Sequence, residues 1–319
     1  MAENKPPESN ESDRSSGIFR PPRLRSSGGR RQSLIILSGL LLAHISSAVE
    51  PAAPTVRVAA IQFPPVMGKT EENLRTITDL VTQAAAQGAK IVVTPECAAQ
   101  GYMDPISLTG WSKQEPGARD VRKVAEPVPG PTTSQLSQLA QKLGIYLCVG
   151  MVESATNDFF NSQVLLSPTG AIVAHHRKKA LWTPGDSSWC SPGDLPVQVV
   201  DTPLGRIGLM ICFDFHVLPK HLAKQKADII LYSVGWYGPN EKEWFQHQFP
   251  QKAVIPFGFS VVAANWTGST DQDEWPGRGH SCIITGDGKV AAMATTVVGN
   301  EIVIADIPVA LKKQIPARP

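Results

Sequence analysis

The stretch "GRIGLMICFDFHVLP" runs from Gly205 to Pro219, and the rest of the sequence is interpreted around it. Its first half is an apolar run of the kind that forms a buried strand. Cys212 stands where that run ends, and Asp214 follows two residues later. A buried strand needs no thiol at its end, and a metal site would need further ligands nearby. Cys212 is therefore either a small core residue or a reactive group.

The composition is that of an ordinary soluble enzyme. The chain has 319 residues, of which 18% are charged and 42% hydrophobic. Residues 1–48 hold seven basic and four acidic residues, so the remainder carries 23 basic and 24 acidic ones. The body of the chain therefore lacks the basic surface that nucleic-acid binding needs, and we expect no nucleic-acid partner.

The N-terminal region has the features of an export signal. An apolar run over residues 34–45 follows Arg30 and Arg31, and Ser46 and Ala48 fit a small-x-small cleavage site. The run is too short to span a bilayer comfortably. We interpret it as a secretory signal cleaved after Ala48, with an uncleaved anchor or a transit peptide as alternatives. The protein is expected to be periplasmic or extracellular, or held at a membrane by this segment.

The cysteines and short motifs favour neither a disulfide framework nor a cofactor. An odd, widely spaced set of cysteines is not a disulfide scaffold in a protein of this size. The five are Cys97, Cys148, Cys190, Cys212 and Cys282. The sequence contains no CxxC or HExxH pattern, so we expect no metal. It also lacks a Walker loop and a GxGxxG motif, so we expect no nucleotide cofactor.

We predict a leader and linker over residues 1–54, followed by one domain over 55–319. Thr70 opens a segment with apolar residues at helical spacing, and Gly88 ends it. Such helices alternate with apolar strands early in the domain, whereas hairpins, one of them about Asp287 and Gly288, are mixed in later. This pattern predicts an α/β layered sandwich rather than a doubly wound sheet.

Three polar residues each lie at or just after the end of an apolar strand: Glu96, Lys178 and Cys212. Taken singly they are ordinary, as a helix cap, a solvated surface lysine and a core thiol. Taken together their chemistries complement one another. A thiol with a pKa near 8.5 is only a few per cent ionised at neutral pH. A neighbouring base can remove its proton during attack, and an ammonium can hold the charge that develops.

Three blocks in the same order resemble the nitrilase (carbon–nitrogen hydrolase) superfamily: "VVTPECAAQGY", "GAIVAHHRKKAL" and "GRIGLMICFDF". The resemblance covers about residues 55–308. It implies a four-layer α-β-β-α sandwich and a Glu–Lys–Cys triad of Glu96, Lys178 and Cys212. Lys178 fits better than Lys179, because the family motif has a leucine three residues after its lysine, as Leu181 is here.

The resemblance also implies supporting residues. A further family glutamate, which orients the lysine or the substrate, matches Glu153, and Asn161 and Asn265 match recurrent asparagines. The backbone N–H of Phe213 would help Lys178 to stabilise the oxyanion. Trp236 and Tyr237 lie where the matching loop lines the substrate pocket, although a structural aromatic cluster is an equal alternative.

The sequence departs from the family pattern at several positions. Phe213 stands where tyrosine is common, Pro219-Lys220 where Pro-Glu is common, and Ala180 where histidine is common. These differences indicate a divergent branch of the family, so we do not infer a particular substrate for this protein from the resemblance.

We expect a thiol-dependent hydrolase of a non-peptide C–N bond, acting on a small amide or carbamoyl compound through a Cys thioester. The alternatives are an acyltransferase on the same scaffold and a non-catalytic binding protein that kept the fold. The resemblance also implies a homodimer or a higher homo-oligomer.

Overall fold

The strands form two six-stranded sheets. The computed structural model describes residues 54–103, 120–236, 240–268 and 277–309. The first sheet has the spatial order β12 (Glu301–Pro308), β1 (Thr55–Gln62), β2 (Ile91–Val93), β3 (Tyr146–Ala155), β4 (Asp158–Leu166), β5 (Ile172–Arg177). The second has the order β11 (Val290–Met293), β10 (Cys282–Ile284), β9 (Ser260–Ala264), β8 (Ile229–Ser233), β7 (Gly205–Ile211), β6 (Val199–Thr202). Both sheets mix parallel and antiparallel neighbours.

The two sheets pack face to face. Their inward side chains form one buried apolar cluster, to which Val58 and Val93 contribute from the first sheet and Leu209, Leu231 and Val262 from the second. Burial of such side chains is the main favourable term in folding. Central strands are covered on both faces, so they appear in the sequence as continuous apolar runs rather than alternating ones.

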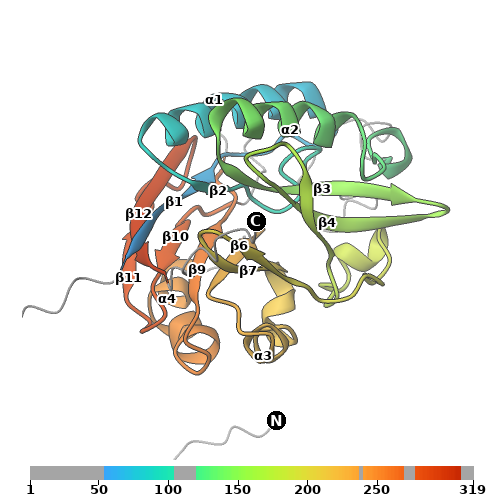
Figure 1. Cartoon of the computed structure of the whole chain (residues 1–319). Helices are drawn as coiled ribbons and strands as arrows, with labels where there is room; N and C mark the ends of the chain where they lie inside the picture. Colours follow the sequence, from blue (N-terminus) through green and yellow to red (C-terminus); the bar gives the residue numbers. More distant parts are fainter. Residues whose placement is uncertain (1–53, 104–119, 237–239, 269–276, 310–319) are drawn as a thin grey trace, which may run out of the picture. The chain divides into compact units, whose positions relative to one another are not determined.

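Helices cover the outer face of each sheet (Figure 1). On the first sheet lie α1 (Thr70–Ala86) and α2 (Pro131–Leu143). On the second lie α3 (Pro219–Lys224) and α4 (Glu241–Glu243), which continues into two π-helical segments, Trp244–Gln248 and Pro250–Val254. The predicted four-layer α-β-β-α sandwich is confirmed.

The early helix follows its sequence pattern closely. Leu74, Ile77 and Val81 of α1 are buried against the first sheet, as their helical spacing indicates. Gly88, just beyond the helix, has a φ of 89°, a left-handed conformation that glycine adopts without strain. The chain therefore ends α1 there and turns into β2.

The sequence pattern predicts no helix over residues 241–254, whereas the structure is helical there. Pro250 cannot donate to the preceding turn, which hides the helical character of the sequence. Phe245 and Phe249 are fully buried on the second sheet. Tertiary packing of an apolar face thus stabilises a helical segment that local propensity does not indicate.

Strand ends from both sheets meet at one edge of the sandwich. Lys178 directly follows β5, Glu96 lies shortly after β2, and Cys212 directly follows β7. The Glu96 N–H donates to the carbonyl oxygen of Val234, after β8, at 3.3 Å. The first and second sheets are therefore joined by a hydrogen bond beside the predicted site.

No helix within the described ranges is both long and apolar enough to cross a membrane. The predicted leader and Tyr237 lie outside the described residues.

Candidate active site

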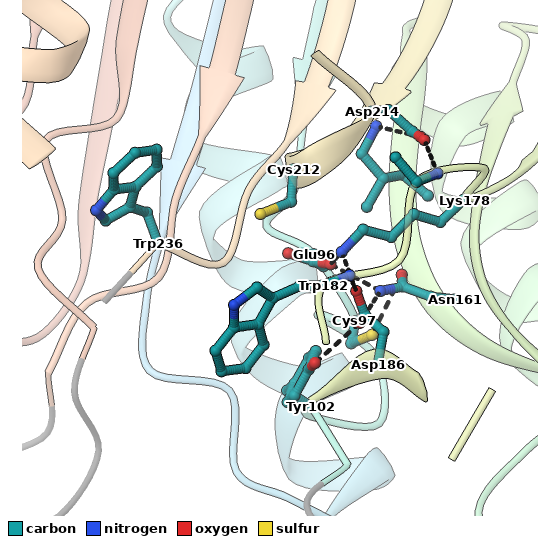
Figure 2. Close-up of polar contacts among 12 residues, drawn as sticks. Glu96, Cys97, Tyr102, Asn161, Lys178, Trp182, Asp186, Cys212, Asp214 and Trp236 are labelled. Atoms are coloured by element: carbon teal, nitrogen blue, oxygen red, sulfur yellow. Dashed lines mark hydrogen bonds and ion pairs between the residues drawn. The ribbon is translucent and has the colours of Figure 1, made fainter. Parts of the chain in front are cut away.

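Glu96 and Lys178 form a buried ion pair beside Cys212. Lys178 Nζ lies 2.6 Å from Glu96 Oε1, and both side chains are 1% exposed. Figure 2 shows the Cys212 side chain pointing toward this pair, and the thiol interacts electrostatically with both partners. Residues separated by more than 80 positions in the chain are thus brought together where the strands end.

Cys212 sits on a strained turn. It is the first residue of the short 3₁₀ helix η4 (Cys212–His216), and its φ is 38°. Positive φ is unfavourable for a residue with a Cβ and persists only where its surroundings hold it. The Tyr232 hydroxyl donates to the Cys212 carbonyl oxygen at 2.8 Å and helps to hold this turn. The turn carries the thiol beyond the end of β7.

Glu96 is fixed at both its backbone and its carboxylate. Trp266 Nε1 donates to the Glu96 carbonyl oxygen at 2.7 Å, and Asn161 Nδ2 donates to Glu96 Oε1 at 2.7 Å. A Cβ at Gly235 would lie only 2.6 Å from Glu96 Oε2. Glycine at this position therefore leaves room for the carboxylate.

A second carboxylate, that of Asp186, contacts the same ammonium group. Asp186 Oδ2 lies 2.6 Å from Lys178 Nζ. Asp186 accepts hydrogen bonds from the Tyr102 hydroxyl at 2.9 Å and from the Trp182 backbone N–H at 2.7 Å. It also accepts from Asn161 Nδ2 at 3.3 Å. Lys178 therefore bridges two buried carboxylates. Sequence reasoning missed Asp186, because an aspartate in a Gly/Ser-containing loop is ordinarily a turn residue.

Burial and charge set the protonation states of this cluster. Burial, and secondarily the charge of Asp186, raise the pKa of Glu96 even though Lys178 opposes the shift. Burial and the nearby carboxylate of Glu96 raise the pKa of the Cys212 thiol. Burial alone would lower the pKa of Lys178, but Asp186 and Glu96 outweigh it and raise that pKa. The resting site thus holds a neutral thiol and a protonated lysine, so nucleophilic attack needs a base.

Glu153 makes no hydrogen bond or ion pair with Lys178 among the described residues, and its role in orienting the lysine or the substrate stays a prediction. Its carboxylate instead pairs with Arg177 and accepts from His175 at 2.8 Å and Ser162 at 2.5 Å. Burial opposes ionisation of Glu153, but these partners outweigh it and lower its pKa to about 2. Arg177 and Lys178 are consecutive, and consecutive residues of an extended chain point to opposite sides. The Glu153 carboxylate, which contacts Arg177, therefore lies away from Lys178.

The other predicted residues lie as follows. Phe213 is the second residue of η4. Its backbone N–H is one of those that the start of a helix leaves without an intrahelical acceptor. Asn265 is fully buried, and its Oδ1 accepts from the backbone N–H of Trp236 at 2.8 Å. This asparagine therefore positions Trp236. The Trp236 ring stacks on Trp244 with centroids 5.1 Å apart. Trp236 thus belongs to an aromatic cluster, whereas Tyr237 lies outside the described residues.

Among the described residues, no group of three or more His, Cys, Asp or Glu side chains is arranged to hold a metal ion. The cluster described above is an acid, an ammonium group and a thiol held at fixed positions, which is the equipment for covalent catalysis by cysteine.

Comparison with known proteins places the chain in a family. The family model for carbon–nitrogen hydrolases matches residues 57–317. The chain belongs to the carbon–nitrogen hydrolase family. The resemblance expected from the three sequence blocks is confirmed, and the protein is an enzyme of this class.

Relatives of this carbon–nitrogen hydrolase include amidases and nitrilases. Omega-amidase NIT2 of Homo sapiens is 30% identical over 278 residues, which cover 82% of this chain and 92% of the relative. Nitrilase 1 of Arabidopsis thaliana is 27% identical over 266 residues, or 75% of each chain. The crystal structure of an amidase from Nesterenkonia sp. matches with a TM-score of 0.67 at 21% identity, covering 82% of this chain and 94% of that chain.

Proposed function

We propose that this carbon–nitrogen hydrolase cleaves the C–N bond of a small amide or carbamoyl compound through a thioester on Cys212. The observation that carries the proposal is the 2.6 Å ion pair of Lys178 and Glu96, toward which the Cys212 side chain points. A solved variant of the Nesterenkonia amidase carries the acetamide moiety of fluoroacetamide at its active site cysteine, which supports the same covalent chemistry here.

In the first half-reaction, Glu96 takes the thiol proton while Cys212 Sγ attacks the carbonyl carbon. The C–S bond forms as the carbonyl π electrons move onto oxygen. Glu96 then passes the proton to the nitrogen, the C–N bond breaks, and ammonia or an amine leaves the thioester. The raised pKa of Glu96 suits both steps, because a catalytic acid–base group works best with a pKa near the working pH.

In the second half-reaction, water gives a proton to Glu96 and its oxygen attacks the thioester carbon. The C–S bond breaks, the carboxylic acid forms, and Cys212 regains its proton. In both halves the Lys178 ammonium and the Phe213 backbone N–H stabilise the oxyanion. Loss of one such donor typically costs about 10²- to 10³-fold in rate. Trp236, which stacks on Trp244, is proposed to line the substrate pocket.

Partition of the Cys212 acyl group between water and hydroxylamine distinguishes the proposed hydrolase from an acyltransferase. The purified protein is incubated with a panel of small amides, carbamoyl amines and nitriles, with and without hydroxylamine. A hydrolase releases ammonia and free acid in the absence of any added amine. Product formation only when an amine acceptor is present would instead identify an acyltransferase.

A non-catalytic binding protein would respond differently to a thiol reagent. Iodoacetamide should modify Cys212 stoichiometrically and faster than the other four cysteines, because Cys212 is partly exposed whereas the other four are buried. Equal, slow modification of all five thiols would favour the binding protein.

Two further proposals concern the whole protein. We propose that it is exported or membrane-anchored through its N-terminal segment, which N-terminal sequencing of the mature protein tests. An intact Met1 in a cytoplasmic fraction would refute export. We also propose a homodimer or higher homo-oligomer, for which light scattering after gel filtration gives the mass; a monomer would refute it.

A further inference from the structure

We propose that Asp214 is a positioning residue that fixes Cys212 relative to Lys178. The inference rests on the proposed function, because it assigns a role in the same reaction. Asp214 is fully buried in η4, just after β7 of the second sheet, whereas Lys178 directly follows β5 of the first. Figure 2 shows hydrogen bonds of its carboxylate as dashed lines.

One carboxylate oxygen of Asp214 holds the backbone that carries the lysine. Oδ1 accepts from the N–H of Lys179 at 2.8 Å and from the N–H of Ala180 at 2.9 Å. These are the two peptide groups that directly follow Lys178. The direction in which the chain leaves β5, and with it the origin of the lysine side chain, is therefore set by Asp214.

The other carboxylate oxygen holds the turn that carries the thiol. Oδ2 accepts from the N–H of Ile211, the residue before Cys212, at 3.2 Å, and it contacts His176 Nε2 at 2.7 Å. The backbone carbonyl of Asp214 also accepts from Leu218 N–H at 2.8 Å. One side chain thus connects the two catalytic segments: Oδ1 contacts the lysine segment, and Oδ2 contacts both Ile211 and His176 of β5.

The hydrogen bonds of Asp214 hold Cys212 in its strained backbone conformation. A residue with a Cβ at a φ of 38° relaxes unless its neighbours hold it. The Ile211 N–H bond to Asp214 spans that residue, and the opposite oxygen anchors it to a different sheet. Loss of the link would allow the thiol and the ammonium to shift relative to each other, and a misplacement of about 1 Å can cost about 10²-fold in rate.

The chemistry of the site requires a carboxylate rather than an amide. All four groups facing the two oxygens are N–H donors or the His176 ring. Asparagine at this position would turn its own N–H₂ toward donors on one side, which leaves buried donors unpaired. The Asp214→Asn variant therefore breaks the link on one side while barely changing the side-chain volume.

The test compares Asp214→Asn with Asp228→Asn in the full-length protein. Asp228 is a matched control, because its Oδ2 also accepts a backbone N–H, that of Arg206 at 2.7 Å, at the other end of β7. For Asp214→Asn we expect kcat to fall about 10²-fold with KM unchanged. Alkylation of Cys212 by iodoacetamide at pH 7 should slow as well, because the thiol is displaced from Glu96, the base that removes its proton. Asp228→Asn should lower the melting temperature only.

A folded Asp214→Asn protein with the kcat and the alkylation rate of Asp228→Asn would overturn the proposal. If Asp214→Asn does not fold, His176→Leu serves instead, because it removes the ring that contacts Oδ2 and leaves the backbone N–H donors to the carboxylate in place. We expect that variant to lose kcat at constant KM, and an unchanged kcat would overturn the proposal equally. If the wild type turned over no amide, the proposed function would fail, whereas the alkylation rates would still decide the role of Asp214.

Discussion

Asp186 places a second negative charge on Lys178, and that charge also acts on Glu96. Burial is the larger cause of the raised pKa of Glu96, and the Asp186 carboxylate adds to it. Removing this like charge lowers the pKa of the Glu96 carboxyl group. The base then stays ionised to lower pH, so Asp186→Asn should move the acidic limb of the kcat/KM profile to lower pH.

The Asp186→Asn variant should also lose about 10- to 100-fold in kcat, because Lys178 is no longer held from both sides. The measurement is a pH–rate profile, with Asp194→Asn as control, since Asp194 is an exposed partner of Arg177. An acidic limb that stays in place or moves to higher pH would show that the charge of Asp186 does not act on the base.

At the same scale, the sequence allowed Glu96, Lys178 and Cys212 to be predicted because each stands at or near the end of a strand. It did not allow Asp186 to be predicted, because that residue lies in a loop without periodicity, eight residues from the lysine that it contacts. It did not reveal that Glu153 pairs with Arg177, since one-dimensional spacing does not show which side of β3 a carboxylate faces.

At the scale of elements, β3 approaches the turn of Glu96 so closely that only glycine fits. A Cβ at Gly150 would lie 2.2 Å from the Pro95 carbonyl oxygen and 2.9 Å from the Cys97 backbone nitrogen. Both are backbone atoms, so the turn itself would have to move. We expect Gly150→Ala to cost about 1–3 kcal/mol of stability and to lower kcat by displacing Glu96.

Gly208→Ala in β7 is the matched control. A Cβ there would meet Leu222 Cδ2 at 2.8 Å and Ile230 Cδ1 at 3.0 Å, which are the ends of side chains that can rotate. Chemical denaturation and steady-state kinetics on both variants provide the measurement. Equal effects of the two substitutions on kcat would contradict the close approach of β3 to the site.

The elements themselves differ in how well the sequence predicts them. Helix α1 was predictable from the spacing of its apolar residues, and the antiparallel pair β10–β11 from the hairpin about Asp287 and Gly288. The π-helical segments were not, because Pro250 interrupts the local pattern and only burial of the aromatic face on the second sheet stabilises them.

At the scale of the whole molecule, buried ion pairs join strands within the sandwich. Glu153 on β3 pairs with Arg177 at the end of β5. Its pKa is lowered to about 2, from an ordinary value of 4.5. The stabilisation is therefore complete above about pH 4.5 and is lost as the pH falls toward 2. Glu153→Gln should lose about 3 kcal/mol at neutral pH, and less in acid.

Urea unfolding at neutral pH and in acid checks this expectation. The control is Asp306→Asn, which breaks the solvent-exposed pair with Arg57 and should change stability little. A loss for Glu153→Gln that stayed the same at both pH values would contradict the linkage between this pair and acid sensitivity.

Cys212 is the proposed nucleophile, and the rate of ammonia release by Cys212→Ala tests this role most directly. Cys282→Ala, which removes a fully buried thiol from β10, is the control. We predict that Cys212→Ala is folded and loses about 10⁴-fold or more in kcat, as enzymes do without their nucleophile, whereas Cys282→Ala retains activity. Ammonia release by Cys212→Ala at the rate of the Cys282→Ala control would contradict the account.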